Sequence, residues 1–529
     1  MVLATFTLKP DYWETISLQE DDIEEIYHHL LEVETPLTVI DLVKILVENR
    51  LEREQKAAES KRSEGGKPYL PKELFEVGEK IVFPNLDWST GFVTNVRDAR
   101  DYSEEGYKVI EIEFESGEKK EFASGLENHK LNILPTIDER DPLLSPTAVV
   151  DTFGDVIADK LKETLESHDD FVYIAGRWFP RALLVEVNLG NLNLAEAVLD
   201  MAGGGPLSTS EILSQVDLPE GVNKKLAEFS LDLALQEDKR FDEVGSAGKV
   251  AWFLKRMEPE DVQNIPLFLR YSPIELPFDE LDEQMIELER RLDDELTPNL
   301  PANGNPKQEA VVTLIFPHWR AGTLPLSPRL AQYFPTAYES PRVRFKLIDG
   351  ETGQDFPGWV VLQQRYVYGL RDWYLDKGIM PGGKILLERG QNPGEVIVRT
   401  EPHRSAKEWV RTALIGADGG IIYAMLKQPV STTYDDWMMI TMPADTTALD
   451  LAWKKREKSP LPFEQVVVDT LRDLAKLNPQ SHVHAAELYS AVNVVYRCPP
   501  GPILGLLSSR PWFDHVGDLH FRYDDSAEG

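Results

Sequence analysis

The sequence predicts a multidomain α+β protein in which helical units that end in β-hairpins are combined with two β-rich domains. Three observations predict this class. The 529 residues exceed what one hydrophobic core can hold, so three or four domains are expected. A helix followed by a hairpin recurs three times along the chain. Two other stretches show the period-two alternation of apolar residues that is typical of strands.

The composition narrows the class of protein. The chain is 42% apolar and 28% charged, which is typical of folded globular domains. Its apolar runs are too short to span a bilayer, so no membrane contact is expected. The first residues lack a secretory signal pattern, and the single cysteine, Cys498, cannot form an internal disulfide. We therefore expect a cytoplasmic protein, with a net charge of −34.

The first unit, residues 1–68, is predicted to be helical and similar to a winged helix. Apolar residues between Asp21 and Asn49 repeat at steps of three and four, which predicts two amphipathic helices. Thr38 can cap the second helix, and Asp41 three residues later supports that start.

Residues 69–135 are predicted to form a small β-barrel. Short β-type runs occupy 80–83, 91–96, 108–114 and 119–123, separated by turn residues. Their order resembles that of Tudor-like barrels, which are accessory modules of nucleic-acid machinery. This domain has eight basic and fourteen acidic residues, so its net charge is −6, which argues against phosphate binding.

The repeated segment predicts two units within 146–260 and a third within 461–525. Each copy has an amphipathic helix, a Phe-x-x-(Val/Ile) strand, a Gly turn and an aromatic return strand, beginning at Phe171, Phe241 and Phe513. We expect these phenylalanines to pack in the cores of their units. Further short helices precede the second and third copies, so the parts are those of a winged helix-turn-helix.

Two of these copies resemble a known family, the HARE-type winged helices, which include a domain of the acidic delta subunit of bacterial RNA polymerase. The matching residues are Leu207-Ser208-Thr209-x-Glu211-Ile212 with Arg240-Phe241-x-x-Val244-Gly245, and His484-x-x-Glu487-Leu488 with Trp512-Phe513-x-x-Val516-Gly517. The second copy departs from the family in its longer turn, Ser246-Ala247-Gly248. Because the third helices lack a concentration of Arg, Lys, Asn and Gln, we expect these units to bind proteins.

Residues 261–310 are predicted to be an acidic helix and a linker. One helix within Pro277–Pro306 would place Leu281, Met285, Leu288, Leu292 and Leu296 along one stripe. This stripe is either a dimer seam or docking surface, or a face that folds back on its own domain. We favour the second interpretation because the pattern covers too few heptads. The oligomeric state stays open.

Residues 311–447 are predicted to form a larger, basic β-domain. Between Val311 and Arg411, fourteen Lys and Arg face ten Asp and Glu, so this block carries +4 while the rest of the chain carries −38. Strands are expected at 342–348, 359–363, 384–388 and 395–399, with a short helix at 370–377.

This block resembles the DNA-binding pseudobarrel of plant auxin-response transcription factors and of some restriction-enzyme effector domains. The resemblance lies in Trp373, Tyr374, Gly382, Gly383, Lys384, Ile385, Leu387 and Glu388, with Gly383 in place of the usual Asp. It implies a barrel that grips the major groove of double-stranded DNA with two arms. The candidate DNA-binding residues are Arg342, Arg344, Arg365, Arg371, Lys384 and Arg389.

The sequence offers no catalytic constellation. None of the ten histidines lies in a metal-binding motif, and His482-x-His484 is interpreted as the start of a helix. Gly203-Gly204-Gly205-Pro206 lacks the Lys-Ser/Thr of a phosphate-binding loop. We therefore predict a chain with no catalytic residue, no metal site and no cofactor.

Two functions follow as hypotheses. In the first, the chain is a non-enzymatic, DNA-binding factor associated with transcription or with the chromosome, and the basic pseudobarrel contacts the DNA. In the second, it is an acidic protein-interaction scaffold, or an accessory of RNA polymerase, with no DNA contact of its own.

Overall fold

The computed structural model describes residues 8–64, 66–83, 86, 89–99, 107–114, 116–132, 141–216, 218–219, 221–274, 281–298, 308–416, 419–443, 445–524 and 526. The chain divides into two units. Unit one comprises residues 1–186 and 219–230, and unit two comprises residues 187–218 and 231–529. The structure is a mixed α+β fold with several separate sheets, as the sequence predicts. Within the described residues, no helix combines the length and apolar character needed to cross a bilayer.

The helical part of unit one joins segments that are far apart in sequence. Its elements are α1 (Glu20–Val33), β1 (Leu37–Thr38), α2 (Val39–Glu64), the 3-10 turn η2 (Pro142–Leu144), α3 (Pro146–Glu166), β7 (Phe171–Ile174), β8 (Arg177–Pro180) and the 3-10 turn η3 (Arg181–Leu183). The three strands form one antiparallel sheet in the order β1-β8-β7. The Thr38 hydroxyl accepts from the backbone N–H of Asp41 at 3.3 Å, which confirms the predicted cap.

A five-stranded sheet lies between α2 and α3 in the sequence. Its strands are β2 (Lys67–Pro68), β3 (Lys80–Phe83), β4 (Ser89–Asp98), β5 (Lys108–Phe114) and β6 (Lys119–Ser124), followed by the 3-10 turn η1 (Lys130–Asn132). They pair in chain order, and in their core the ring of Phe83 stacks on Tyr69 and packs at a tilt against the partly buried Phe122. The four predicted strands are confirmed. The predicted boundary at residue 68 separates β1 from β8, yet these strands pair, so the sheet is an insertion within one helical unit.

Unit two begins with the second copy of the repeat. Its elements are α4 (Leu189–Met201), β9 (Leu207–Ser208), α5 (Thr209–Leu213), α6 (Lys224–Glu237), β10 (Phe241–Glu243) and β11 (Ala251–Leu254). Helix α6 crosses the boundary between the units. As in unit one, the first strand of this sheet, β9, lies beside the third, β11, so the order is β9-β11-β10. Trp252 is 1% exposed, and its indole N–H donates to Asp232 Oδ1 at 2.8 Å in the core of this repeat.

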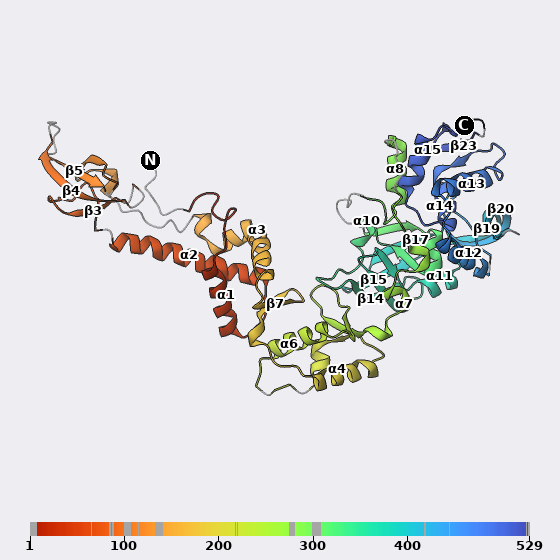
Figure 1. The fold of residues 1–529 in the computed structure, drawn as a ribbon, viewed down its shortest axis with the longest axis horizontal. Helices are drawn as coiled ribbons and strands as arrows, with labels where there is room; N and C mark the ends of the chain where they lie inside the picture. Colours follow the sequence, from red (N-terminus) through yellow and green to blue (C-terminus); the bar gives the residue numbers. More distant parts are fainter. Residues whose placement is uncertain are drawn as a thin grey trace. The chain divides into compact units, whose positions relative to one another are not determined.

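A curled sheet of seven strands forms the centre of unit two (Figure 1). Its order is β12-β17-β18-β14-β15-β16-β13, and only β14 and β18 pair in parallel within the described sheet. The strands are β12 (Glu309–Thr313), β13 (Thr323–Pro325), β14 (Arg342–Asp349), β15 (Asp355–Val361), β16 (Tyr366–Tyr368), β17 (Lys384–Arg389) and β18 (Glu395–Arg399). Helices α9 (Phe316–Ala321), α10 (Pro328–Ala331) and α11 (Arg371–Lys377) interrupt them. Side chains from these strands, α10 and α11 form an apolar core.

The remaining elements surround a second, largely helical core. A long hairpin, β19 (Pro402–Ile415) and β20 (Ile421–Thr432), leads to α12 (Thr447–Lys458). The third copy of the repeat follows with α13 (Phe463–Ala475), β21 (Val483–His484), α14 (Ala485–Val495), α15 (Pro500–Ser509), β22 (Phe513–Gly517) and β23 (His520–Tyr523). Its sheet order is β21-β23-β22, so all three copies share one topology.

The segment between the second repeat and the sheet differs from the prediction. It contains α7 (Glu260–Gln263), the 3-10 turns η4 (Lys255–Met257) and η5 (Leu267–Leu269), and α8 (Glu283–Leu292). Part of the predicted helix, 275–280 and 299–307, lies outside the described residues. The prediction that one helix includes Leu296 is wrong, because Asp293 adopts a left-handed conformation and ends α8. Met285 and Leu288 are buried in the C-terminal core, as expected for a helix that folds back on its own domain.

Candidate functional site

The six predicted DNA-binding residues do not converge on one surface. They come from β14, the turn before β16, the start of α11 and the two ends of β17. Lys384 begins β17 and Arg389 ends it, which separates their Cα atoms by roughly 17 Å. Arg371 and Lys384 make no side-chain hydrogen bond or ion pair with any described residue. The predicted cluster is therefore spread along the sheet.

Three of the arginines donate to backbone carbonyl groups inside unit two. Arg344 Nη1 donates to Gly205 O at 2.7 Å, Arg365 Nη1 donates to Glu295 O at 3.1 Å, and Arg389 donates to Gln332 O through Nε and Nη2. These contacts hold the guanidinium groups to particular positions. They use some of the donors that phosphate oxygens and guanine edges would need.

The outward side of β14 and β15 is covered by the second repeat. Arg344 N donates to Val244 O at 2.8 Å, which ties the residue after β10 to β14. Behind this bond, Phe253 of β11 meets the ring of Trp359 edge to face, with ring centroids 5.2 Å apart. Arg342 and Arg344 are two residues apart, so their side chains lie on the same face of β14. This face is thus an internal contact between the second repeat and the seven-stranded sheet, both within unit two.

Arg342 lies in this contact between two carboxyl groups. Its Nη1 is 2.5 Å from Asp242 Oδ2 and 3.5 Å from Glu258 Oε2. Burial raises the pKa of Glu258 to about 8. The hydrogen bond and the negative charge of Asp242 raise this pKa further, and the positive charge of Arg342 lowers it. At neutral pH Glu258 therefore keeps its proton, and the ion pair of Arg342 is with Asp242.

The proton on Glu258 predicts a stability that falls as the pH rises. Its ordinary pKa is 4.5, so between that pH and about 8 the folded state holds a proton that the unfolded chain has released. The free energy of unfolding therefore decreases across this range. We expect the Tm at pH 8.5 to lie below that at pH 6, and Glu258→Gln, which cannot ionise, to remove at least about 2 °C of the difference.

The control for this measurement is Glu287→Gln, because the Glu287 side chain is 75% exposed. Both variants are followed by circular dichroism at the two pH values. Glu287→Gln should keep the wild-type pH dependence. An equal dependence in Glu258→Gln and wild type would mean that Glu258 is ionised in the folded state.

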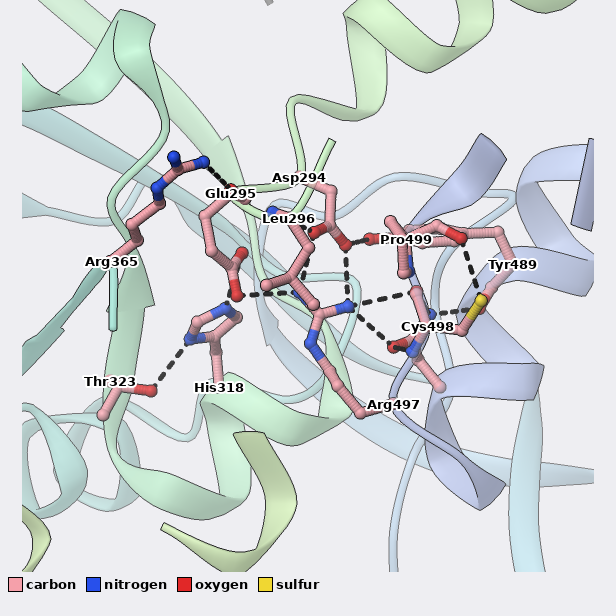
Figure 2. A network of polar contacts seen from close by, with 11 residues as sticks. Asp294, Glu295, Leu296, His318, Thr323, Arg365, Tyr489, Arg497, Cys498 and Pro499 are labelled. Carbon is pink, nitrogen blue, oxygen red and sulfur yellow. Dashed lines mark hydrogen bonds and ion pairs between the residues drawn. The ribbon is translucent and has the colours of Figure 1, made fainter. Parts of the chain in front are cut away.

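A fully buried charge network joins the C-terminal repeat to the seven-stranded sheet (Figure 2). Arg497, between α14 and α15, contacts Asp294 Oδ1 and Glu295 Oε1 through Nη2, both at 2.7 Å. Its Nη1 also donates to Asp294 Oδ2 at 2.8 Å. Tyr489 of α14 donates its hydroxyl to the same Asp294 oxygen at 2.5 Å. The network thus connects α14 with the turn that follows α8.

The second carboxylate carries the network into the sheet. His318 Nε2 lies 3.2 Å from Glu295 Oε2, and its Nδ1 lies 2.8 Å from the Thr323 hydroxyl on β13. Burial alone would raise the pKa of Glu295, but the charges of Arg497 and His318 outweigh it and hold the pKa below its ordinary value. The carboxylate is therefore ionised and accepts a hydrogen bond from His318. Since these side chains are at most 4% exposed, the network stabilises the fold and is closed to a substrate.

Cys498 and His484 are held in structural contacts. Burial raises the pKa of the Cys498 thiol well above its ordinary value, and its Sγ donates to Pro499 O at 3.0 Å. A protonated, buried thiol is a poor nucleophile. His484 Nδ1 accepts from Ala486 N at 3.1 Å and caps α14, and its ring stacks on Trp437. Among the described residues, no group of three or more His, Cys, Asp or Glu side chains could hold a metal ion.

Two adjoining clefts lie where the turn after β10 meets the sheet, with volumes of about 690 and 450 Å³. Ser246 and the loop Asn392–Glu395 line both. Arg344 lines the larger cleft and Arg389 the smaller one, so the structure brings two of the six predicted residues to neighbouring hollows. Lys249, on the turn itself, also lines the larger cleft.

Sequence reasoning missed the residues that organise these sites. Lys249 follows the longer turn Ser246-Ala247-Gly248, and that departure from the family pattern is the signal that could have identified it. Arg497 stands in an apolar stretch, Val494-Val495-Tyr496 before it and Cys498-Pro499 after it, where a lone cation needs a buried acidic partner. Asp294 and Glu295 lie about 200 residues earlier, so no local pattern indicates them.

Comparisons with known proteins add no further assignment. No family model matches the chain, no curated protein matches it, and no solved structure matches it.

Proposed function

We propose that the chain is a non-enzymatic, acidic scaffold that binds protein partners in nucleic-acid machinery, with RNA polymerase as the first partner to test. We interpret the three units of shared topology as winged helices, because each has three helices and a three-stranded sheet that places the first strand beside the third. The resemblance of two of them to the acidic polymerase subunit implies the same kind of partner. The curled sheet is interpreted as the pseudobarrel.

The observation that carries the proposal is the use of the predicted DNA-binding residues inside unit two. Arg342 is paired with Asp242 beside the buried Glu258, and the strand face that it shares with Arg344 is covered by the second repeat. A surface that grips DNA needs several cations that point together toward the phosphates. The arrangement of these six residues favours the scaffold over the DNA-binding factor.

The third helices of the repeats support the same conclusion. Helix α15 contains no Lys or Arg. In α3, Lys160 donates to the backbone oxygens of Glu14 and Ile16, and Lys162 pairs with Glu166 at 3.8 Å. In a DNA-binding winged helix this is the element that enters the groove. Helices with so few available cations are better suited to protein contacts.

Helix α4 offers an apolar surface for such a partner. Ala195 and Leu199 face the core of the second repeat, whereas Leu194, Ala197 and Met201 lie on the opposite, exposed side. Leu194 is 47% exposed and Met201 is 90% exposed. Their spacing of three and four residues places them on one stripe, which is the pattern of a helix that packs against another protein.

The test measures binding of the full chain to purified RNA polymerase and to a 30-base-pair duplex. We expect the polymerase complex to form at 150 mM salt and to survive nuclease treatment, and Leu194→Lys with Met201→Lys to weaken it at least tenfold. Leu451→Lys is the control, because Leu451 is 61% exposed on α12. Duplex binding that falls steeply with salt and is lost in Arg344→Ala would favour the DNA-binding factor instead.

A further inference from the structure

We propose that the larger of the two clefts, between the β10–β11 turn and the seven-stranded sheet, binds a small organic anion. A phosphate or carboxylate group of this ligand would meet Arg344 and Lys249, and its apolar body would lie along Phe356 and Pro357. The cleft is defined by these residues together with the loop Asn392–Glu395. The proposal is independent of the proposed function, because it concerns a different surface from α4.

Arg344 is the first reason for an anionic ligand. Its guanidinium carbon lies 5.1 Å from the ring centroid of Phe253 and 5.7 Å from that of Trp359, so aromatic rings replace part of its hydration. Its Nη1 donates to Gly205 O at 2.7 Å, which leaves Nε and Nη2 for a ligand. Among the described residues it has no carboxylate partner, and burial lowers its pKa with no acidic neighbour to oppose this. In a chain with a net charge of −34, an unpaired and partly desolvated arginine is unusual. An anion that enters the cleft would compensate its charge.

Lys249, on the β10–β11 turn, supplies a second cation to the lining of the cleft. It forms no ion pair with any described residue and is exposed on the turn. The turn that carries it is held in place, because Glu243 Oε1 accepts from Gly245 N at 2.8 Å and from Ala251 N at 3.4 Å. Ala247 N also donates to Thr336 O at 2.6 Å, which ties the turn to the sheet domain. Lys249 is thus presented by a braced turn.

The remaining cation of the cleft is already paired. Lys346 Nζ lies 3.6 Å from Asp355 Oδ2, and both side chains are more than 60% exposed. This pair neutralises itself at the rim. Glu395, the other acidic residue of the cleft, accepts from the backbone and side-chain nitrogens of Asn392. Asn392 is neutral, so Glu395 keeps its negative charge, and the Asn392 hydrogen bonds lower its pKa. Three cations against two carboxylates leave the lining of the cleft at +1, and the cations without a carboxylate partner among the described residues are Arg344 and Lys249.

The volume of the cleft suits a small molecule. A volume of about 690 Å³ lies within the range of roughly 300–1,000 Å³ that is typical of small-molecule and cofactor sites. It accommodates a nucleotide or an aromatic acid, and it does not accommodate a segment of double helix. Phe356, Pro357 and Pro206 provide apolar walls for a flat body, and guanidinium geometry suits phosphate and carboxylate equally well.

The experiment titrates the full chain by isothermal calorimetry with adenosine monophosphate, phenyl phosphate, benzoate and uncharged adenosine. We expect saturable binding of at least one charged probe and none of adenosine. Binding of the phosphates alone would identify a phosphate ligand, and binding of benzoate alone a carboxylate ligand. Arg344→Gln and Lys249→Gln should each weaken the binding at least tenfold.

The control variant is Arg522→Gln. Arg522 lies in β23, far from the cleft residues in the sequence, and forms an exposed ion pair with Asp514. It should bind the probes as wild type does. Because Arg344→Gln could perturb the fold, Lys249→Gln on the exposed turn provides an independent test. The proposal is overturned if no charged probe binds, or if both cleft variants bind the probes as well as wild type does. It is also overturned if a single-stranded 12-nucleotide DNA binds in a Lys249-dependent manner while the small probes do not bind.

Discussion

Arg497→Met should destabilise the C-terminal part of unit two by about 3–5 kcal/mol. This is the usual cost of removing one partner of a buried ion pair, because the other charge stays buried without compensation. The substitution leaves Asp294 and Glu295 buried without the cation that both contact at 2.7 Å. It also removes the link between α14 and the turn after α8. The change is measured by urea unfolding, with hydrogen exchange of α14 and α15 to locate the loss.

Arg522→Met is the matched control, because Arg522 forms an exposed pair with Asp514 at 2.6 Å. An exposed pair contributes about 0–1 kcal/mol, so this variant should be close to wild type. Adding Asp294→Asn and Glu295→Gln to Arg497→Met should recover part of the stability by removing the unpaired charges. If Arg497→Met costs no more than Arg522→Met, the network has no role in holding the C-terminal repeat.

Trp252→Ala should cost about 3–5 kcal/mol in the second repeat. The side chain is 1% exposed, so its removal leaves a cavity among α4, α6 and β10. It also removes the indole N–H that donates to Asp232 at 2.8 Å in the same core. The expected result is faster hydrogen exchange in α4, β10 and β11, together with a lower urea midpoint.

Two further variants separate the causes of this loss. Trp252→Phe keeps much of the volume but lacks the N–H, so it should cost less than alanine and report mainly on the bond to Asp232. Trp409→Ala removes the same residue type from a site that is 63% exposed on β19, and it should change stability by less than about 0.5 kcal/mol. Equal losses at positions 252 and 409 would contradict the assignment of Trp252 to the core.

Much of the local structure could be predicted from the sequence because it depends on neighbouring residues. The strand at 395–399 has the predicted bounds, and the helix at 370–377 begins one residue later than expected. Strands β13 and β16, with three residues each, escaped prediction because so short a run shows no alternation. The pairing of β1 with β8 joins residues about 140 positions apart, and no local pattern encodes it.

The candidate site was harder to predict because its charges act across the fold. Counting charges along the chain identified the basic block correctly, but it could not show that Asp242, from the second repeat, neutralises Arg342. A two-residue period places Arg342 and Arg344 on one side of β14, and only the tertiary packing shows that the second repeat covers that side. The prediction of DNA contacts for these residues stays untested.

The insertion of the five-stranded sheet between α2 and α3 has a consequence for synthesis on the ribosome. Leu37 leaves the exit tunnel about 140 residues before its pairing partner Trp178, a delay on the order of 10 s at ordinary elongation rates. During that interval the nascent α1 and α2 have no α3 against which to bury Leu42 and Leu46. The apolar faces of this emerging helical pair therefore stay uncovered until α3 has been synthesised.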